Sequence, residues 1–376
     1  MKLLHLADLH LGKRVNEFSM LEDQKVVLRE ILEIVDEEKT DGVLIAGDVF
    51  DKSVPSEEAL KEWEIFLLGL VKRGQQVFVI GGNHDSAVRL SVHNKLIEAA
   101  GIHISSEYNG EVAGYTFQDA YGPWHVFLLP FVKPAHVRTI YPEETIENYT
   151  DAIRVALSKT ELRKEERNII LAHQFVIGAQ KCDSEEINVG GLDSVDGGVF
   201  DDFDYVALGH IHGPQKVGKD TVRYSGTPLK YSFSEVSHKK SVTLLEMREK
   251  DDIRISLREL HPPHDMRLIR GTFEEVMHPD EAQMSSCEDY VHIVLTDEED
   301  VYEAMARLRV IYPNVMKLSY DNARTRENHE ITVDEKIHQK TPMQLFEQLY
   351  ELQNNCEMSE KQKAFVTELM GRIWKE

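Results

Sequence analysis

The 376 residues, 41% hydrophobic and 29% charged, have an ordinary composition for a soluble globular protein and suffice for about two or three domains. The formal net charge of −23 argues against a protein that coats nucleic acid through basic side chains, because phosphate binding normally comes from Lys and Arg. No apolar run reaches the ~18 residues that span a bilayer, and three scattered cysteines favour a reducing compartment, so we expect a cytoplasmic location.

The first 260 residues alternate between short apolar strands and amphipathic helices, which is the pattern of an α/β fold. The apolar periodicity predicts four helices, at Met20–Glu38, Ser56–Lys72, Val88–Ala100 and Glu144–Lys164. From Tyr205 onward the pattern becomes strand and turn, with strands expected at Arg223–Ser225 and Ser241–Met247.

A domain boundary is expected at His261-Pro262-Pro263. Beyond it, two strand-like runs enclose one helical run, which predicts a compact β-α-β unit. These three segments are Tyr290–Thr296, Asp300–Ile311 and Val315–Tyr320.

Two short helices are predicted at the C-terminal end of the chain. Thr341-Pro342 places proline at a first helical position, and Ser359 with Gln362 forms a capping box for the second helix. Both helices carry an apolar stripe, and a hairpin of this size cannot bury both stripes within itself. Either the hairpin packs back onto the parent domain or it docks onto a partner protein, and we favour docking.

Five apolar runs end in a cluster of Asp, His or Asn. These runs are Leu3–Ala7 before Asp8 and His10, Val43–Ala46 before Asp48, Val77–Ile80 before Asn83, His84 and Asp85, Ile169–Ala172 before His173, and Val206–Leu208 before His210 and His212. Ligands of α/β sheets gather beyond the strand ends. Five such clusters therefore predict a metal site assembled from across one sheet.

The donor residues of this predicted site combine nitrogen and oxygen without thiolate, which suits Mn²⁺, Fe²⁺ or Zn²⁺ better than Ca²⁺ or a structural zinc. Seven donors are too many for one ion, so a pair of ions is expected, and the Asp48 carboxylate has two oxygens with which to bridge them. Such a pair activates water for in-line attack on a phosphate ester. The seven are Asp8, His10, Asp48, Asn83, His173, His210 and His212.

His84 is left over from this donor set, and we assign it as the general acid that protonates the leaving group. Asp51, three residues after Asp48, is a candidate to orient His84 by a hydrogen bond. Asp85 is the alternative orienting residue, although a cap or turn role suits it better.

The motifs, taken in this order, resemble the calcineurin-like metallophosphoesterases: Asp-x-His at 8–10, Gly-Asp-x-x-Asp at 47–51, Gly-Asn-His-Asp at 82–85, the lone His173, and Gly-His-x-His at 209–212. Within that superfamily, residues 4–12, residues 224–229 and the C-terminal additions are similar to the SbcD nuclease family. The resemblance implies a β-sandwich flanked by helices, with a small α/β capping domain and a C-terminal helical hairpin. The implied ranges are 1–263 for the nuclease domain, 264–338 for the DNA-selecting capping domain and 339–376 for the hairpin.

The resemblance further implies a Mn²⁺-dependent DNA nuclease, active as a 3′→5′ exonuclease on double strands and as an endonuclease on single strands and hairpins. The hairpin would dock the SbcC coiled-coil ATPase, the enzyme would work at the nucleoid, and it would form a homodimer through nuclease-domain helices, for which Ser56–Lys72 and Val88–Ala100 are candidates. Two ligand sets are implied: Asp8, His10, Asp48 and His212 for one ion, and Asp48, Asn83, His173 and His210 for the other. Several relatives carry His where Asp51 stands.

Three alternatives compete with this interpretation. A phosphoprotein phosphatase usually carries Arg after the Gly-Asp-x-x-Asp and Gly-Asn-His motifs to clamp a terminal phosphate, whereas Lys52 and Ser86 stand at the following positions here. A cyclic-nucleotide or other small-molecule phosphodiesterase has no need of the C-terminal additions. A metal-free scaffold predicts lost ligands, and none of the seven donors is missing.

Overall fold

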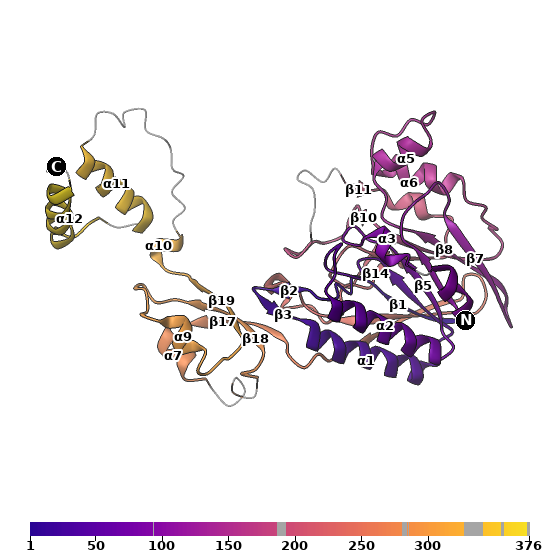
Figure 1. Ribbon diagram of the computed structural model, residues 1–376, viewed down its shortest axis with the longest axis horizontal. Helices are drawn as coiled ribbons and strands as arrows, with labels where there is room; N and C mark the ends of the chain where they lie inside the picture. Colours follow the sequence, from indigo (N-terminus) through magenta and orange to yellow (C-terminus); the bar gives the residue numbers. More distant parts are fainter. Residues whose placement is uncertain are drawn as a thin grey trace. The chain divides into compact units, whose positions relative to one another are not determined.

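The computed structural model describes residues 1–92, 94–185, 193–279, 284, 286–326, 341–354 and 357–373. The chain separates into two compact units, Met1–Asp265 and Met266–Glu376 (Figure 1). No helix within the described ranges is both long and apolar enough to cross a membrane.

The first unit contains two six-stranded sheets. The first sheet has the order β16 (Ile253–Glu259), β15 (Ser241–Met247), β1 (Lys2–Leu6), β4 (Gly42–Ala46), β5 (Gln76–Ile80), β6 (Ile102–Ser105). The second has the order β13 (Gln215–Val217), β14 (Lys219–Tyr224), β12 (Tyr205–Gly209), β9 (Arg167–His173), β8 (Gly122–Leu129), β7 (Ala113–Asp119). Neighbouring strands from β1 to β6 and from β14 to β8 are parallel, and antiparallel strands flank both runs.

The two sheets pack face to face around an apolar layer. Alternate residues of each strand face this layer, as the pleat requires, and Leu44, Phe78, Leu171 and Ala207 are among its fully buried members. His5 replaces an apolar residue there: its ring contacts the Tyr205 hydroxyl (3.0 Å) and the Leu208 carbonyl (3.2 Å) of the opposite sheet. Burial lowers the pKa of His5 to about 3, so the ring is neutral at pH 7.

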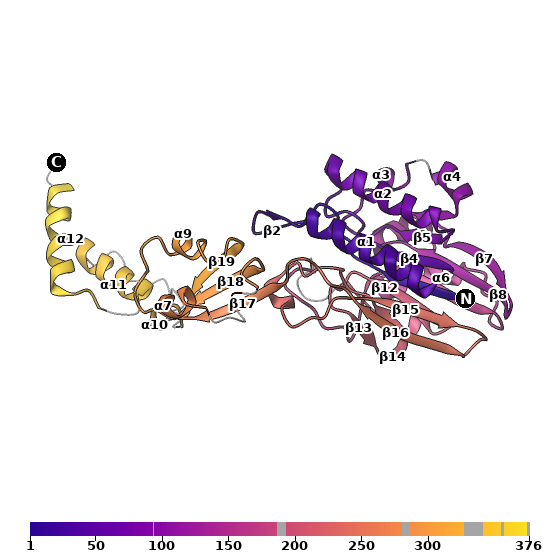
Figure 2. The ribbon, with the colours of Figure 1, turned by 90° about the horizontal axis from the view of Figure 1, so that it is seen from below.

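Helices cover the outer faces of the sandwich. Figure 2 shows α1 (Leu21–Glu38) and α2 (Glu57–Lys72) beside the first sheet, on the side away from β12 to β14. On the second sheet, α5 (Pro134–Ile140) and α6 (Tyr149–Ser158) bury apolar side chains against the outer face of β9 and β12. Both α2 and α6 begin with a capping side chain, Ser56 and Asn148 respectively. The central parallel strands β1, β4, β5, β9 and β12 are therefore buried on both faces.

The first two predicted helices are confirmed within one residue at each end. The predicted helix Val88–Ala100 is wrong: the described residues form α3 (Ala87–Leu90), α4 (Asn94–Ile97) and a 3-10 turn at Glu98–Ala100. The predicted helix Glu144–Lys164 is shorter, and α5 was missed. The apolar spacing of 88–100 fits a helix, but many of its apolar side chains lie exposed, so no core packing holds it continuous.

The second unit begins with a parallel three-stranded sheet, β17 (Met266–Gly271), β18 (Tyr290–Leu295) and β19 (Val315–Tyr320), packed against α7 (Phe273–Met277) and α9 (Ala304–Leu308). Both predicted strands are confirmed, while β17 and α7 were missed. After α10 (Ala323–Arg326), the described C-terminal part contains α11 (Pro342–Asn354) and α12 (Glu360–Ile373). The Ser359–Gln362 capping box is confirmed by reciprocal hydrogen bonds.

Candidate metal centre

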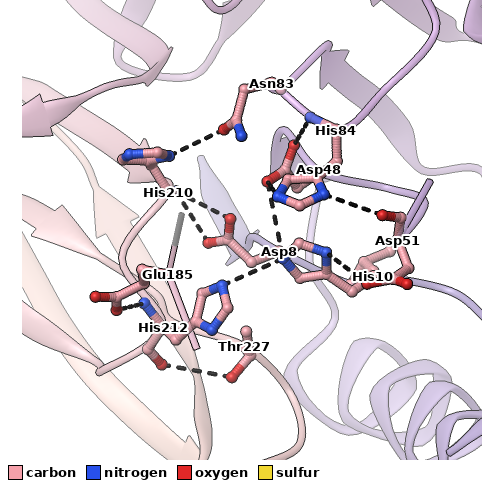
Figure 3. Close-up of polar contacts among 12 residues, drawn as sticks. Asp8, His10, Asp48, Asp51, Asn83, His84, Glu185, His210, His212 and Thr227 are labelled. Carbon is pink, nitrogen blue, oxygen red and sulfur yellow. Dashed lines mark hydrogen bonds and ion pairs between the residues drawn. The ribbon is translucent and has the colours of Figure 1, made fainter. Parts of the chain in front are cut away.

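The predicted donors come together at the ends of strands from both sheets (Figure 3). β1, β4 and β5 lead into the first three clusters, and β9 and β12 lead into His173, His210 and His212. The expectation of a single sheet is therefore wrong: the five strands divide between two facing sheets. The apolar pattern of a strand cannot show whether the strands form one sheet or two, because a buried parallel strand is apolar on both faces in either arrangement.

The backbone is strained where these clusters begin. Asp8, His10, Asp48 and His210 all adopt positive φ angles, of 53°, 44°, 49° and 100°. Each costs roughly 1 kcal/mol or more in an L-residue. Hydrogen bonds hold the two loops in register, from the Asp8 N–H to the Gly47 carbonyl (3.0 Å) and from the His10 N–H to the Asp48 carbonyl (2.9 Å). Strain of this kind concentrates at functional sites.

Two glycines allow the clusters to approach one another. A Cβ atom on Gly82 would lie 2.0 Å from Oδ1 of Asp48, and one on Gly209 would lie 1.8 Å from the Ala46 carbonyl oxygen. Neither position leaves room for a side chain. The motif glycines are therefore required by the close packing of the strand ends that carry the donors.

Asp48 lies at the centre of the site and is almost fully buried. Its Oδ2 is 3.4 Å from Nε2 of His173, 3.7 Å from Nε2 of His10 and 3.9 Å from Nε2 of His84. Its Oδ1 accepts a hydrogen bond from the backbone N–H of His84 (2.9 Å). One carboxylate thus faces imidazoles from both sheets.

One side of the site contains Asp8, His10 and His212, whose donor atoms lie within 4.8 Å of one another. The Nε2 atoms of His10 and His212 are 3.2 Å apart, and the Asp8 carboxylate accepts the backbone N–H of His210 at 2.9 Å. On the other side, Asn83 Oδ1 lies 3.1 Å from His173 Nε2 and 3.0 Å from His210 Nδ1. The structure therefore brings all seven predicted donors together.

The charges of the buried site favour a cation. Burial raises the pKa of Asp8, while for Asp48 the neighbouring His173 and His10 outweigh burial and hold the pKa well below its usual range. Burial opposes a charge on His173, but the carboxylates of Asp48 and Asp8 outweigh it and raise the pKa of the ring to about 9. The two carboxylates thus attract positive charge to this site. Burial and His173 lower the pKa of His210 to about 3, which leaves it neutral, the form that binds metal.

The donor set fits divalent metal ions. It combines buried carboxylates with buried imidazoles, contains no thiolate, and gathers nitrogen and oxygen atoms in one small space. Among the described residues, Asp48 belongs to two further groups of three side chains whose donor atoms lie close together. One group is Asp48 with His10 and His84, and the other is Asp48 with Asp8 and His173. The site therefore meets the chemical requirements of a divalent-metal centre.

His84 is fixed by the Asp51 backbone. Its Nδ1 donates to the Asp51 carbonyl oxygen (3.0 Å), which leaves Nε2 facing the Asp48 carboxylate. The Asp51 side chain instead accepts from Lys13 (2.7 Å). The carboxylate of Asp85 accepts the backbone N–H groups of Gly82, Val49 and Phe50 and so fastens the turn. The predicted contact between residues 51 and 84 exists, but the carbonyl group makes it.

Several residues that support the site were missed by the sequence analysis. Gln24 of α1 is buried. Its side chain donates to the carbonyls of Leu9 and His10 and accepts from the Gly12 N–H, so it holds the loop that carries Asp8 and His10 in place. Around His212 lie Ser184, Glu185, Glu235 and Lys240. Polar and charged residues outside motifs are normally exposed to solvent, so the residue types gave no signal of this role.

Comparison with known proteins places the chain in a family. The calcineurin-like phosphoesterase profile matches residues 1–214, and the profile described as Type 5 capsule protein repressor C-terminal domain, SbcD_C, matches residues 262–354. The D subunit of the nuclease SbcCD from Staphylococcus epidermidis is 31% identical over 328 residues, which are 85% of each chain. The chain belongs to the SbcD family of calcineurin-like phosphoesterases. As a member, it is a metal-dependent phosphodiester hydrolase.

Among solved structures, the chain is similar to a dimetal phosphatase from Danio rerio, with 14% identity and a TM-score of 0.42, covering 69% of this chain and 96% of that one. The protein TT1561 of Thermus thermophilus has 14% identity and a TM-score of 0.39, covering 68% of this chain and 98% of its own.

Proposed function

We propose that the chain is the nuclease subunit of a complex with an SbcC-type coiled-coil ATPase, acting in DNA repair, recombination and replication. Its activities would be ATP-dependent 3′→5′ exonuclease on double strands and endonuclease on single strands and hairpins. The observation that carries this proposal is the 31% identity to the D subunit of a nuclease SbcCD over 85% of both chains. The seven donors gathered at the strand ends support it.

We assign the donors to two Mn²⁺ ions that share Asp48. One ion would be held by Asp8, His10, Asp48 and His212, and the other by Asp48, Asn83, His173 and His210. Bound there, the ions would supply the positive charge that neutralises phosphate oxygens and an activated water for in-line attack. The position of the Asp48 carboxylate between imidazoles from both sheets supports its shared role.

His84 would protonate the departing oxygen. The Asp51 carbonyl requires a proton on Nδ1, so a second proton on Nε2 makes the ring an imidazolium with its acidic N–H beside Asp48. This N–H lies at the edge of the site and is only partly buried, where a substrate phosphate has access. Transfer of that proton to the leaving alkoxide leaves neutral His84, still held by the Asp51 carbonyl.

The test of the proposed function is a nuclease assay with purified chain. With Mn²⁺ alone it should cut single strands and hairpins, and with the ATPase and ATP it should degrade duplex ends from the 3′ side. The competing phosphatase and small-molecule phosphodiesterase are tested on phosphomonoesters and cyclic nucleotides. Hydrolysis of those substrates without DNA cleavage would reject the nuclease proposal. We assign the choice between duplex ends and single strands to the capping domain, residues 264–338.

The hairpin of α11 and α12 is proposed to dock the ATPase. It leaves Phe346, Leu349, Phe365 and Leu369 exposed, and a groove of about 290 Å³ between its helices is lined by apolar side chains such as Met358. A coiled-coil surface that presents apolar side chains would fill such a groove.

Phe365→Glu should therefore weaken capture of the ATPase by about 30-fold or more, the loss typical of a buried aromatic contact. Surface plasmon resonance with immobilised ATPase would measure it. Ala364→Glu adds the same charge to a neighbouring position of α12 and should bind normally. Equal affinity of the Phe365→Glu variant and the wild-type chain for the ATPase would reject this docking site. The Mn²⁺-dependent nuclease activity of both variants should equal that of the wild-type chain, which shows that the nuclease domain is intact.

A homodimer through nuclease-domain helices is proposed from exposed apolar side chains. Leu60, Ile65 and Leu68 of α2 are 41–58% exposed, and Val88 and Leu96 on the short helices are more than 70% exposed. Leu68→Glu should convert a dimer to a monomer in sedimentation equilibrium. Lys164→Glu, at an exposed position outside the proposed interface helices, should stay dimeric. A wild-type chain that sediments as a monomer at micromolar concentration would contradict the proposal.

A further inference from the structure

We infer that Ser184 and Glu235 are positioning residues that fix the tautomer of His212 and so direct the lone pair of its Nε2 into the metal centre. The inference rests on the proposed role of His212 as a metal ligand. Neither residue belongs to a sequence motif. Ser184 lies in a turn, and Glu235, 51 residues further along the chain, ends the 3-10 helix Phe233–Glu235.

The contacts form a chain that runs away from the metal centre. Nε2 of His212 faces Nε2 of His10 at 3.2 Å, and Nδ1 on the opposite side of the ring is 2.7 Å from Oγ of Ser184. The same Oγ is 2.6 Å from Oε1 of Glu235. A single hydroxyl therefore connects the ring to a carboxylate.

The number of protons decides the direction of each hydrogen bond. An ionised carboxylate can only accept, so the one hydroxyl proton of Ser184 is donated to Glu235. The Ser184 oxygen must then accept from His212, which places the ring proton on Nδ1. Nε2 is left with a lone pair, and a metal ligand requires this form.

Glu235 stays ionised and fixed because it is buried in an ion pair. Its side chain is 0% exposed, and its Oε2 is 2.5 Å from Nζ of Lys240. Lys240 also donates to the carbonyl of His212 (2.9 Å), and the carboxylate of Glu185 accepts the N–H of His212 (2.7 Å) (Figure 3). His212 is thus held at its ring by Ser184, and at its N–H and its carbonyl by the charged residues Glu185 and Lys240.

The substitution Glu235→Gln tests this chain because it keeps the shape and reverses the proton order. The Lys240 ammonium only donates, so the amide oxygen of the new side chain must face it. The amide nitrogen then donates to the Ser184 oxygen, and the Ser184 hydroxyl turns to donate to Nδ1 of His212. The ring proton moves to Nε2, and the lone pair directed at the metal centre is lost.

Isothermal titration of the full chain with Mn²⁺ should show about ten- to hundredfold weaker binding for Glu235→Gln, the usual effect of losing a partner that orients a ligand. Ser184→Ala should weaken binding in the same direction, and Ser184→Thr, which keeps the hydroxyl, should restore it. Glu166→Gln is the matched control, because Glu166 contacts the buried ring of His125, which is outside the metal centre, and its variant should bind Mn²⁺ normally.

Nitrogen-15 NMR of the metal-free chain gives a readout that general destabilisation does not change. Wild-type His212 should carry its proton on Nδ1, and Glu235→Gln should move it to Nε2. Unchanged Mn²⁺ affinity in folded Glu235→Gln, or an unchanged tautomer, would overturn the inference. If Glu235→Gln does not fold, Ser184→Ala and Ser184→Thr decide the question by affinity, and equal affinities overturn it.

His212→Ala separates this inference from the proposed function. If His212→Ala binds Mn²⁺ as tightly as the wild-type chain, the proposed ligand set is wrong. If His212→Ala weakens binding while Glu235→Gln and Ser184→Ala do not, the ligand set stands and only the positioning role is overturned.

Discussion

Asp48→Asn should lower kcat/KM for DNA cleavage by about 10³-fold or more, because one carboxylate serves both proposed ions and several kcal/mol of charge stabilisation depend on it. The amide keeps the size of the side chain but loses the negative charge beside His173 and His10, whose Nε2 atoms lie 3.4 and 3.7 Å from Oδ2. Calorimetric titration with Mn²⁺ should show that binding is weakened at both ions.

Asp41→Asn is the matched control for this change. Asp41 precedes the same strand, β4, at the end opposite Asp48, and its carboxylate accepts the backbone N–H of Lys2 (2.6 Å), which the amide oxygen can also do. This variant should cleave DNA normally. Activity of Asp48→Asn within tenfold of the wild-type chain would show that the carboxylate is not shared by the ions.

His84→Ala should reduce kcat for DNA cleavage by about 10²- to 10⁴-fold, the range of general acid catalysis, while Mn²⁺ affinity stays unchanged. The ring lies beside Asp48 but its Nδ1 is already held by the Asp51 carbonyl, so its loss removes a proton donor and no proposed ligand. His136→Ala, at an exposed position of α5, should have no effect on either quantity.

A phosphodiester with a p-nitrophenolate leaving group distinguishes general acid catalysis from other roles of His84. This leaving group departs without protonation, so His84→Ala should hydrolyse it at nearly the wild-type rate. An equal loss on this ester and on DNA would falsify the general-acid assignment and favour a role in substrate binding.

The donors were predictable from sequence because each follows a short apolar run, and a strand end determines where its next residues lie. Asp8, Asp48 and His173 could therefore be placed without knowing how the strands pair. The two-sheet arrangement could not be predicted from these runs, because pairing depends on contacts between distant segments that one sequence does not reveal. It was implied only by the resemblance of the motifs.

The residues that support the donors were beyond sequence reasoning for a related reason. Glu235 and Lys240 are charged residues in a strand-and-turn region, where solvent exposure is the usual expectation, yet they are buried as an ion pair. The role of Asp51 shows a further limit. The position was identified, but the contact with His84 uses the backbone carbonyl, which every residue type has.

The division of the donors between two sheets has a consequence for how the protein acquires its metal. The first sheet leads into Asp8, His10, Asp48 and Asn83, and the second into His173, His210 and His212. With the ligand sets proposed above, neither sheet alone carries all the donors of either ion, so a newly made chain would take up its ions only after the sandwich has closed. Binding to the closed state alone shifts the folding equilibrium toward it. The metal centre would then stabilise the contact between the two sheets, in addition to the apolar layer and the contacts of His5.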